Sequence, residues 1–164
     1  MKQIPLTQGQ FALVDDADFE WLNQWKWCAQ KARDTFRVVR NVRQPNGTRT
    51  TMFMHRLILG LTDPKIQGDH RNGDGLNNQR DNLRPATNQQ NKHNQSMRSD
   101  NTSSVRGVSW DQRTGKWLAQ IGVNGTNKCI GYFDNLKDAK QARLDAELKY
   151  HGQFSAALSR GAAA

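Results

Sequence analysis

The sequence predicts an α+β protein built from two small domains. Short β-rich segments bounded by turn residues recur along the chain, and the longest helical pattern, at residues 136–150, follows the last of them. Hydrophobic residues make up 35% of the chain, below the roughly 45–50% usual for globular domains, which favours two small cores. We expect a domain at residues 1–95, a linker at 96–104, a second domain at 105–155 and a tail at 156–164.

The first half combines a strand pattern, a short helix and a hairpin. Residues 11–14 are apolar and predict a strand, and Asp18 is a candidate cap for a helix that ends near Asn23. The hairpin pairs residues 36–43 with residues 48–54 around a Pro-Asn-Gly turn. These elements predict a β-rich N-terminal region with one short helix.

Several side chains in this half have two interpretations. Trp21, Trp25 and Trp27 suit core anchors better than base-stacking groups, because each ring buries a large apolar area. His55 opens a short helical segment and is either a structural histidine or an auxiliary group near a site. Three arginines of the hairpin could contact phosphate or could simply face solvent: Arg37, Arg40 and Arg43.

The second half predicts a three-stranded meander followed by one helix. The strands are expected at residues 105–110, 117–123 and 128–133, and Asn-Gly before the third strand is a strong hairpin signal. Alanines recur at helical spacing between residues 136 and 150, which suits a helix lying close against a sheet. Gly152 is expected to end this helix.

The charge of the chain predicts a polyanionic partner. The formal net charge is +9 and the isoelectric point is about 10.0. Residues 134–149 hold four basic and four acidic side chains, whereas residues 105–132 hold one acid, Asp111, against four basic residues: Arg106, Arg113, Lys116 and Lys128. A solubilising surface would be mixed throughout, so this pattern favours nucleic acid.

The cysteines and the hydropathy pattern predict an intracellular protein. Cys28 and Cys129 lie far apart in different expected domains, and the chain has no Cys-x-x-Cys pair to hold zinc. The N-terminus has no apolar signal core, and no window approaches the roughly 18 apolar residues of a membrane span. We expect a cytoplasmic protein with no membrane partner.

The polar stretch between Asp69 and Asn91 is the candidate site. Cleavage of a phosphodiester needs a base to activate water and a cation to neutralise the phosphoryl charge. Asp69 and His70 are adjacent, so an extended backbone would send Asp69 toward a metal ion and His70 toward the water. The Asn82 amide could accept from the His70 ring and fix its tautomer, and Gly73 allows a tight turn. From spacing alone, an inert Asn-rich loop is the favoured interpretation.

The same stretch resembles the HNH endonuclease motif in its H-N-N form. The resemblance covers roughly residues 5–95 and is carried by Asp69-His70, Asn72-Gly73, residues 77–84, Thr87 and Asn91, with the upstream segment Met54-His55-Arg56-Leu57. It implies a ββα-metal fold in which His70 is the general base, Asn82 orients His70, and Asp69 and Asn91 bind the metal. Some members have His where this chain has Asn91, and a harder oxygen ligand favours Mg²⁺ or Mn²⁺. The four-Cys zinc site of some members is absent from this sequence.

The second half resembles an AP2 DNA-binding domain. The matching segments are residues 105–110, 115–121 and 131–133 and the Ala-rich helix. The resemblance implies a three-stranded sheet that enters the major groove while the helix braces its back. Trp117 could equally belong to the core, and the arginines could read guanine edges or hold phosphates. The candidate contacts by position are Arg106, Trp110, Arg113, Lys116, Trp117, Gln120 and Lys128.

Together these patterns predict a metal-dependent, homing-like DNA endonuclease that recognises double-stranded DNA and nicks it as a monomer. The free-standing phage and bacterial HNH proteins that it resembles act in the cytoplasm of a bacterial or phage-infected cell. One alternative is a non-catalytic DNA-binding regulator that uses the AP2-like half. A weaker alternative is RNA binding, because strands fit the deep, narrow major groove of A-form RNA poorly.

Overall fold

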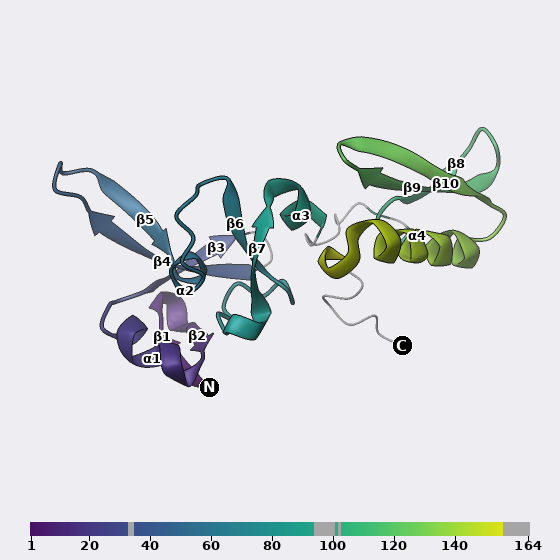
Figure 1. Ribbon diagram of the computed structural model, residues 1–164. Coiled ribbons are helices and arrows are strands. Elements are labelled where there is room, and N and C mark those ends of the chain that lie inside the picture. The colour runs from purple at the N-terminus through teal and green to yellow at the C-terminus, as the bar shows by residue number, and fades with distance from the viewer. Residues whose placement is uncertain (33–34, 94–100, 102, 156–164) are drawn as a thin grey trace. The chain divides into compact units, whose positions relative to one another are not determined.

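The computed structural model describes residues 1–32, 35–93, 101 and 103–155 (Figure 1). It has a mixed α+β fold with several small sheets. The chain divides into two compact units, Met1–Lys92 (unit 1) and His93–Ala164 (unit 2), which we describe separately. The expected linker lies mostly, and the expected tail entirely, outside the described residues.

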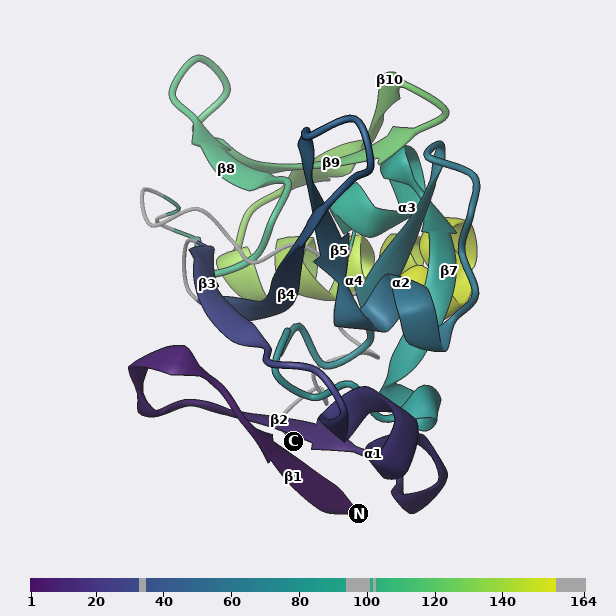
Figure 2. The same cartoon turned by 90° about the vertical axis from the view of Figure 1, so that its left-hand side faces the viewer.

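The described residues of unit 1 form three small antiparallel sheets and three α-helices. β1 pairs with β2, the middle strand β4 pairs with β3 and β5, and β6 pairs with β7. The β1–β2 ladder and α1 lie together at one end of the unit (Figures 1 and 2). The elements are β1 Lys2–Pro5, β2 Phe11–Val14, α1 Asp16–Asn23, β3 Cys28–Ala32, β4 Thr35–Arg43, β5 Arg49–Phe53, α2 Met54–Ile58, β6 Ile66–His70, β7 Leu83–Thr87 and α3 Asn88–His93.

Two elements of unit 1 differ from the sequence prediction. α1 begins at Asp16, and the expected cap Asp18 lies inside the helix with a side chain only 2% exposed. The cap prediction was wrong because Asp18 is used for long-range contacts instead. β3 was not predicted, since Cys-Ala-Gln-Lys-Ala has no β-branched or aromatic residue. It is a strand because it pairs with β4 along one edge. On its other edge, the Ala29 N–H donates to the Thr7 hydroxyl and the Gln8 amide nitrogen donates to the Ala29 carbonyl oxygen.

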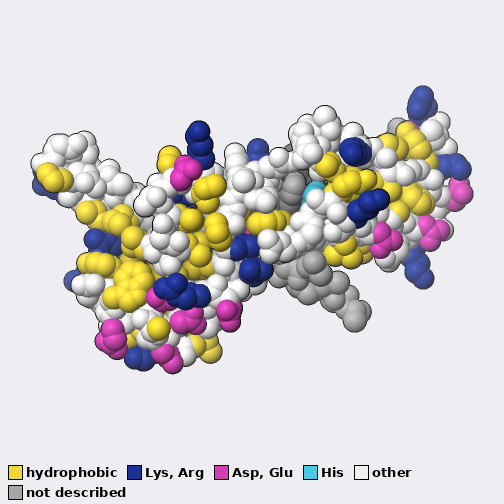
Figure 3. All heavy atoms as spheres, viewed as in Figure 1, with side chains coloured by type: hydrophobic (Ala, Val, Ile, Leu, Met, Phe, Trp, Pro, Cys, Tyr) yellow, Lys and Arg dark blue, Asp and Glu magenta, His cyan; other side chains and the backbone are white. Residues whose placement is uncertain are grey.

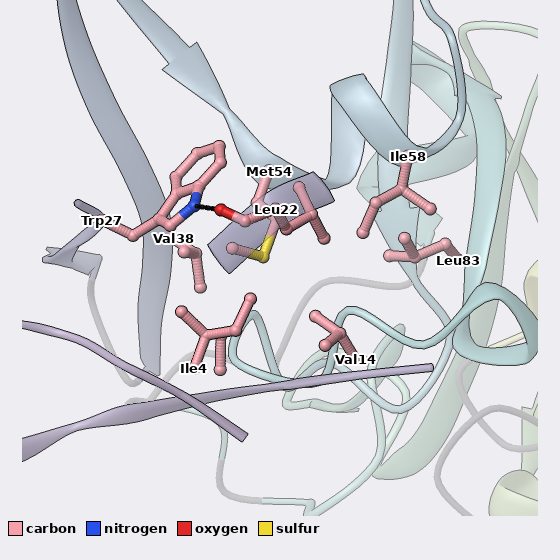
Figure 4. Packing of buried hydrophobic residues seen from close by; sticks show 9 residues of the cluster. Ile4, Val14, Leu22, Trp27, Val38, Met54, Ile58 and Leu83 are labelled. Atoms are coloured by element: carbon pink, nitrogen blue, oxygen red, sulfur yellow. Dashed lines mark hydrogen bonds between the residues drawn. The ribbon is translucent and has the colours of Figure 1, made fainter. Parts of the chain in front are cut away.

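The core of unit 1 joins the N-terminal hairpin to the helices and to β4 and β7. Trp27 is 2% exposed, and its indole N–H donates to the Leu22 carbonyl oxygen over 2.9 Å (Figure 4). Trp21 and Trp25 are half-buried against this core, which confirms the tryptophans as core anchors. The other large buried side chains of the cluster are Ile4, Val14, Leu22, Val38, Met54, Ile58 and Leu83.

Unit 2 is a three-stranded antiparallel sheet, order β10-β9-β8, with one helix packed on it. The strands are β8 Val108–Asp111, β9 Lys116–Val123 and β10 Thr126–Phe133, and the helix is α4 Leu136–His151. The core contains Val108, Ala119 and Ala139. The first strand starts later than expected, because the segment before it turns at Gly107, whose φ of +75° favours glycine.

A buried ion pair lies within α4. Arg143 donates to Glu147 over 2.9 Å one helical turn later, and the Ser155 hydroxyl donates to the other Glu147 oxygen over 3.1 Å. All three residues are buried. In the part of the chain that the structure describes, no helix is both long and apolar enough to cross a membrane.

Candidate functional site

A long loop joins β6 to β7, and His70 stands at its start. The two strands pair from Ile66 opposite Thr87 to His70 opposite Leu83. The chain turns at once after His70, where the Gly73 N–H donates to the His70 carbonyl oxygen over 2.9 Å. It then continues to residue 82 before β7 begins. We call residues 71–82 the site loop; the expected turn is present, but most of the loop follows it.

The asparagines and aspartates of the site loop largely satisfy its own backbone. Asn72 accepts from the Asp74 N–H over 2.9 Å, and Asp74 accepts from the Leu76 N–H over 3.0 Å. Asn77 accepts from the Gln79 N–H over 3.3 Å. Such bonds from a side chain to a backbone N–H two residues on are typical of Asx turns. Much of the polar composition therefore serves the shape of the loop.

Asn82 braces the site loop from within. Its amide oxygen accepts from the Asn72 N–H over 3.1 Å, and its amide nitrogen donates to the Asn77 carbonyl oxygen over 2.7 Å. We expected this amide to accept from the ring of His70. The Asn82 side chain instead makes its hydrogen bonds within the site loop. Any effect of Asn82 on His70 is therefore indirect, through the loop that follows His70.

An arginine ties the site loop to helix α1. The Arg80 guanidinium donates to both carboxylate oxygens of Asp18, over 2.8 and 2.7 Å. The Arg80 backbone N–H donates to Asp15 over 2.8 Å, and this hydrogen bonding explains why Asp15 makes no side-chain cap at α1. The hydrogen bonds with Asp18 raise the pKa of Arg80 above its ordinary value. This bidentate contact therefore holds the site loop against α1.

The site loop is also joined to two strands. Leu13 of β2 donates to the Leu76 carbonyl oxygen over 2.9 Å and accepts from the Asn78 N–H over 2.8 Å. The Gly75 N–H donates to the Thr35 hydroxyl over 3.3 Å at the start of β4. A Cβ at Gly75 would collide with the Phe36 carbonyl oxygen, so only glycine allows this approach.

His70 lies beside a second histidine. The rings of His70 and His55 meet edge to face with centroids 5.0 Å apart, and His55 also contacts the Phe53 ring at 5.6 Å. Burial is the main cause that lowers the pKa of both imidazoles, that of His55 to about 3. Both rings are therefore neutral at pH 7, and a neutral imidazole can accept a proton.

The Asn78 side chain acts on His70 from within the site loop. Asn78 is fully buried, and its amide nitrogen donates to the carbonyl oxygens of Gly75 (3.2 Å) and Leu76 (3.1 Å). Its buried amide oxygen has no hydrogen-bond partner among the described residues. The Asn78 side chain raises the pKa of His70, against the larger lowering by burial. Asn78, and not Asn82, is thus the asparagine whose side chain acts on His70.

Asp69 points to the opposite face of β6 and is held by an arginine. Asp69 is 4% exposed and lies opposite Arg84 in the β6–β7 register. Two nitrogens of Arg84 lie 2.7 Å from one Asp69 oxygen. The carboxylate is thus oriented by a buried ion pair, a feature that the sequence did not predict.

Asn91 is brought to the same face as Asp69. Thr87 and Gln90 form a reciprocal capping box at the start of α3, with bonds of 2.8 and 3.3 Å. The Asn91 amide nitrogen then donates to the Gln67 side-chain oxygen over 2.5 Å. Gln67 stands two residues before Asp69, so strand alternation places both on one face.

These oxygens fit a hard divalent cation in part. Carboxylate and amide oxygens suit Mg²⁺, which usually keeps waters and binds substrate phosphate as well. Within the described residues, no three His, Cys, Asp or Glu side chains are grouped as metal ligands. A cation would therefore depend on Asp69, on the Asn91 amide oxygen and on groups from the substrate.

The candidate DNA contacts of unit 2 divide between the two faces of its sheet. Lys116 and Gln120 alternate with Trp117 along β9 and lie on the face away from Ala119 and the core. Trp117 packs against the core, and Trp110 meets it edge to face at 5.3 Å. On the face seen in Figure 3, basic side chains are scattered over this unit and do not gather in one patch.

The remaining basic candidates also occupy different places. Lys128 pairs with Ile121, and its ammonium lies 5.3 Å from the Tyr150 ring, on the helix side of the sheet. Arg113 is exposed in the β8–β9 turn. Arg106 precedes the sheet and acts electrostatically on the buried Arg143. We call the face of the sheet away from the core the open face. This face and the adjoining β8–β9 turn hold three of the candidate DNA contacts: Arg113, Lys116 and Gln120.

We predict that Gly75→Ala destabilises unit 1, because the added methyl group would collide with the backbone of β4. The free energy of unfolding should fall by about 1–3 kcal/mol, as for other overpacking substitutions. Urea unfolding followed by tryptophan fluorescence measures this. Gly122→Ala is the control, since its Cβ would meet only the Asn127 side chain at 3.5 Å. Equal stability of both variants would contradict the close approach.

We also predict that acid weakens unit 1 through His55. Its pKa of about 3 in the folded state lies below the ordinary 6.5, so unfolding takes up a proton between these pH values. Stability should be complete above pH 6.5 and fall on acidification by up to about 1.4 kcal/mol per pH unit. Urea titrations from pH 7 to 4 should give a shallower slope for His55→Gln. An unchanged slope would show that His55 does not carry the effect.

No family model, curated protein or solved structure matches the chain at the level of a significant similarity. The function is therefore inferred from the residues of the site and from their geometry.

Proposed function

We propose that unit 1 is a metal-dependent HNH-type endonuclease that nicks double-stranded DNA, with His70 as its general base. The observation that carries the proposal is the place of His70 at the end of β6, in ring contact with His55, where burial lowers its pKa. Support also comes from the succession of β6, β7 and α3, a hairpin followed by a helix. This succession is what the ββα-metal fold would require.

In the proposed reaction, His70 takes a proton from a water molecule. The water oxygen then forms a bond to phosphorus while the bond from phosphorus to the 3′ oxygen breaks, and the 3′ oxygen leaves and is protonated. His70 is suited to this step because its free electron pair is not blocked by a proton at pH 7.

Asp69 and Asn91 would hold the metal ion. Mg²⁺ or Mn²⁺ bound there would neutralise charge on the phosphoryl oxygens and on the leaving oxygen. Gln67 positions the Asn91 amide by accepting from its nitrogen, which leaves the amide oxygen available as a ligand. Arg84 orients the Asp69 carboxylate from the neighbouring strand. Such supporting partners are expected around metal ligands.

Unit 2 would bind the DNA target in the manner of an AP2 domain. The open face of its sheet offers Lys116 and Gln120, and the adjoining turn offers Arg113. Trp117 is better explained as a core residue. The Lys116 ammonium lies 3.0 Å from the exposed Asp134 carboxylate, and this weak surface pair could give way to a phosphate contact.

A second candidate function is DNA binding without cleavage. The buried Asp69–Arg84 ion pair favours this alternative, because a carboxylate already neutralised by arginine has no need of a metal ion. Under this alternative the nuclease fold would be retained only as a scaffold. Cleavage activity separates the two functions directly.

We predict that the full-length protein with Mg²⁺ converts supercoiled plasmid to the open-circle form. His70→Ala should abolish nicking, because the water then has no base. EDTA should have the same effect on the wild-type protein. Gel quantification of the open-circle fraction measures both. If wild-type protein and His70→Ala are equally inert while both bind DNA, the non-catalytic alternative holds.

Asn78 and Asn82 should differ in their effects on nicking. Asn78→Ala removes the side chain that acts on His70 and should slow nicking by about 10–100-fold. Asn82→Ala removes a brace of the loop and should mainly lower stability. Nicking rates measured well below the unfolding temperature of each variant distinguish these roles. A larger loss of rate in folded Asn82→Ala than in folded Asn78→Ala would reverse the assignment.

A further inference from the structure

The hairpin of β4 and β5 is the most purely basic segment of unit 1. Residues 35–53 contain four arginines and no acidic residue. Arg40 differs from the others, because its guanidinium lies 4.2 Å over the Trp25 ring and is half-buried there. The other three are exposed, and within the described residues none of them makes a hydrogen bond or ion pair through its side chain: Arg37, Arg43 and Arg49.

These three arginines share one face of the sheet. Arg43 lies directly opposite Arg49, and Asn41 opposite Thr51, in the β4–β5 register. Arg37 precedes Arg43 by six residues on the same strand, so alternation places it on this face as well. We call this surface the arginine face. Its far end lies on the part of the hairpin that projects from the body of unit 1 (Figures 1 and 3).

The pairing of Arg43 with Arg49 is unfavourable in the protein alone. Side chains directly opposite on antiparallel strands have Cβ atoms about 4.5–5.5 Å apart, and like charges at this distance destabilise the sheet. No acidic residue between residues 35 and 53 offsets them. An anionic partner would offset this repulsion. The guanidinium group matches phosphate in particular, because it can donate two parallel hydrogen bonds.

The near end of the arginine face adjoins the candidate site. Gly75 of the site loop contacts β4 at Thr35 and Phe36, immediately before Arg37. Phe53 at the end of β5 contacts His55, which contacts His70. The charge of Arg37 also contributes to lowering the pKa of both histidines. The face therefore begins beside His70 and extends away from it.

The length of the face fits several base pairs. From Arg37 to Arg43 the strand advances about 20 Å at roughly 3.3 Å per residue. This distance corresponds to about six base-pair steps of a duplex at 3.4 Å each. Arginines at its two ends would therefore reach phosphates that are well separated along the DNA.

We propose that the arginine face binds the sugar–phosphate backbone of duplex DNA on one side of the phosphodiester that the water activated by His70 attacks. The inference rests on the proposed nuclease function and adds a partner-binding surface to the same unit. Unit 1 then holds its substrate through its own hairpin, in addition to the contacts of unit 2. These contacts carry no base information, because they are made to phosphates.

The test compares full-length Arg43→Gln and Arg49→Gln with Lys31→Gln. Lys31 is exposed on the same sheet, but it pairs with Phe36 and so lies on the opposite face. Binding of a labelled duplex is measured in EDTA over a series of KCl concentrations. Each arginine variant should reduce the slope of log affinity against log salt by about 0.9, the value for one phosphate contact. Lys31→Gln should keep the wild-type slope.

Unchanged slopes in both arginine variants would overturn the proposal, as would stronger competition by duplex RNA than by duplex DNA. The nuclease function is tested separately, in the plasmid assay with Mg²⁺.

If the wild-type protein nicks DNA and the arginine variants keep the wild-type slope of log affinity against log salt, only the proposal for the arginine face is refuted. If the wild-type protein never nicks but the slopes fall, the nuclease function is refuted. In the nicking assay, Arg43→Gln should raise the DNA concentration needed for half-maximal rate and leave the maximal rate unchanged.

Discussion

The bidentate contact between Arg80 and Asp18 is the interaction on which the candidate site depends. The site loop contains almost no core-forming side chains, so it cannot hold its shape by burial. Asp18 is 2% exposed and reaches the loop from helix α1, and its other contact, the Trp21 indole N–H at 3.0 Å, fixes its position. A polar segment is thereby attached to α1, which contributes Leu22 to the hydrophobic core. His70 lies at the start of that fastened loop.

The alternation of β6 then separates two kinds of chemistry. Asp69 and His70 are neighbours in the chain, and the extended backbone sends them to opposite faces. The His70 face is aromatic and amide-lined, which keeps the imidazole neutral. The Asp69 face carries Arg84, Gln67 and Asn91, which are polar or charged. A proton acceptor and a set of oxygen ligands can therefore be adjacent without neutralising one another.

The sequence predicted the helices and strands better than it predicted which side chains contact one another. Local sequence patterns were enough to predict the hairpin of β4 and β5, the strands of unit 2 and helix α4. β3 was missed because only its neighbours make it a strand. The contact with His70 was expected for Asn82 and not for Asn78, because both occur in one Asn-rich loop and only three-dimensional contacts distinguish them. Arg84 was not foreseen as the partner of Asp69, because its role depends on strand register.

The attachment of the site loop to three separate elements has a consequence for when the site exists during folding. α1, β2 and β4 must all be in place before the loop can close on them. A partly folded chain, such as one still leaving the ribosome, would hold the right residues in the wrong arrangement. The assembly of the candidate site is thus coupled to completion of the N-terminal core, and a nascent chain does not hold these residues in their final arrangement.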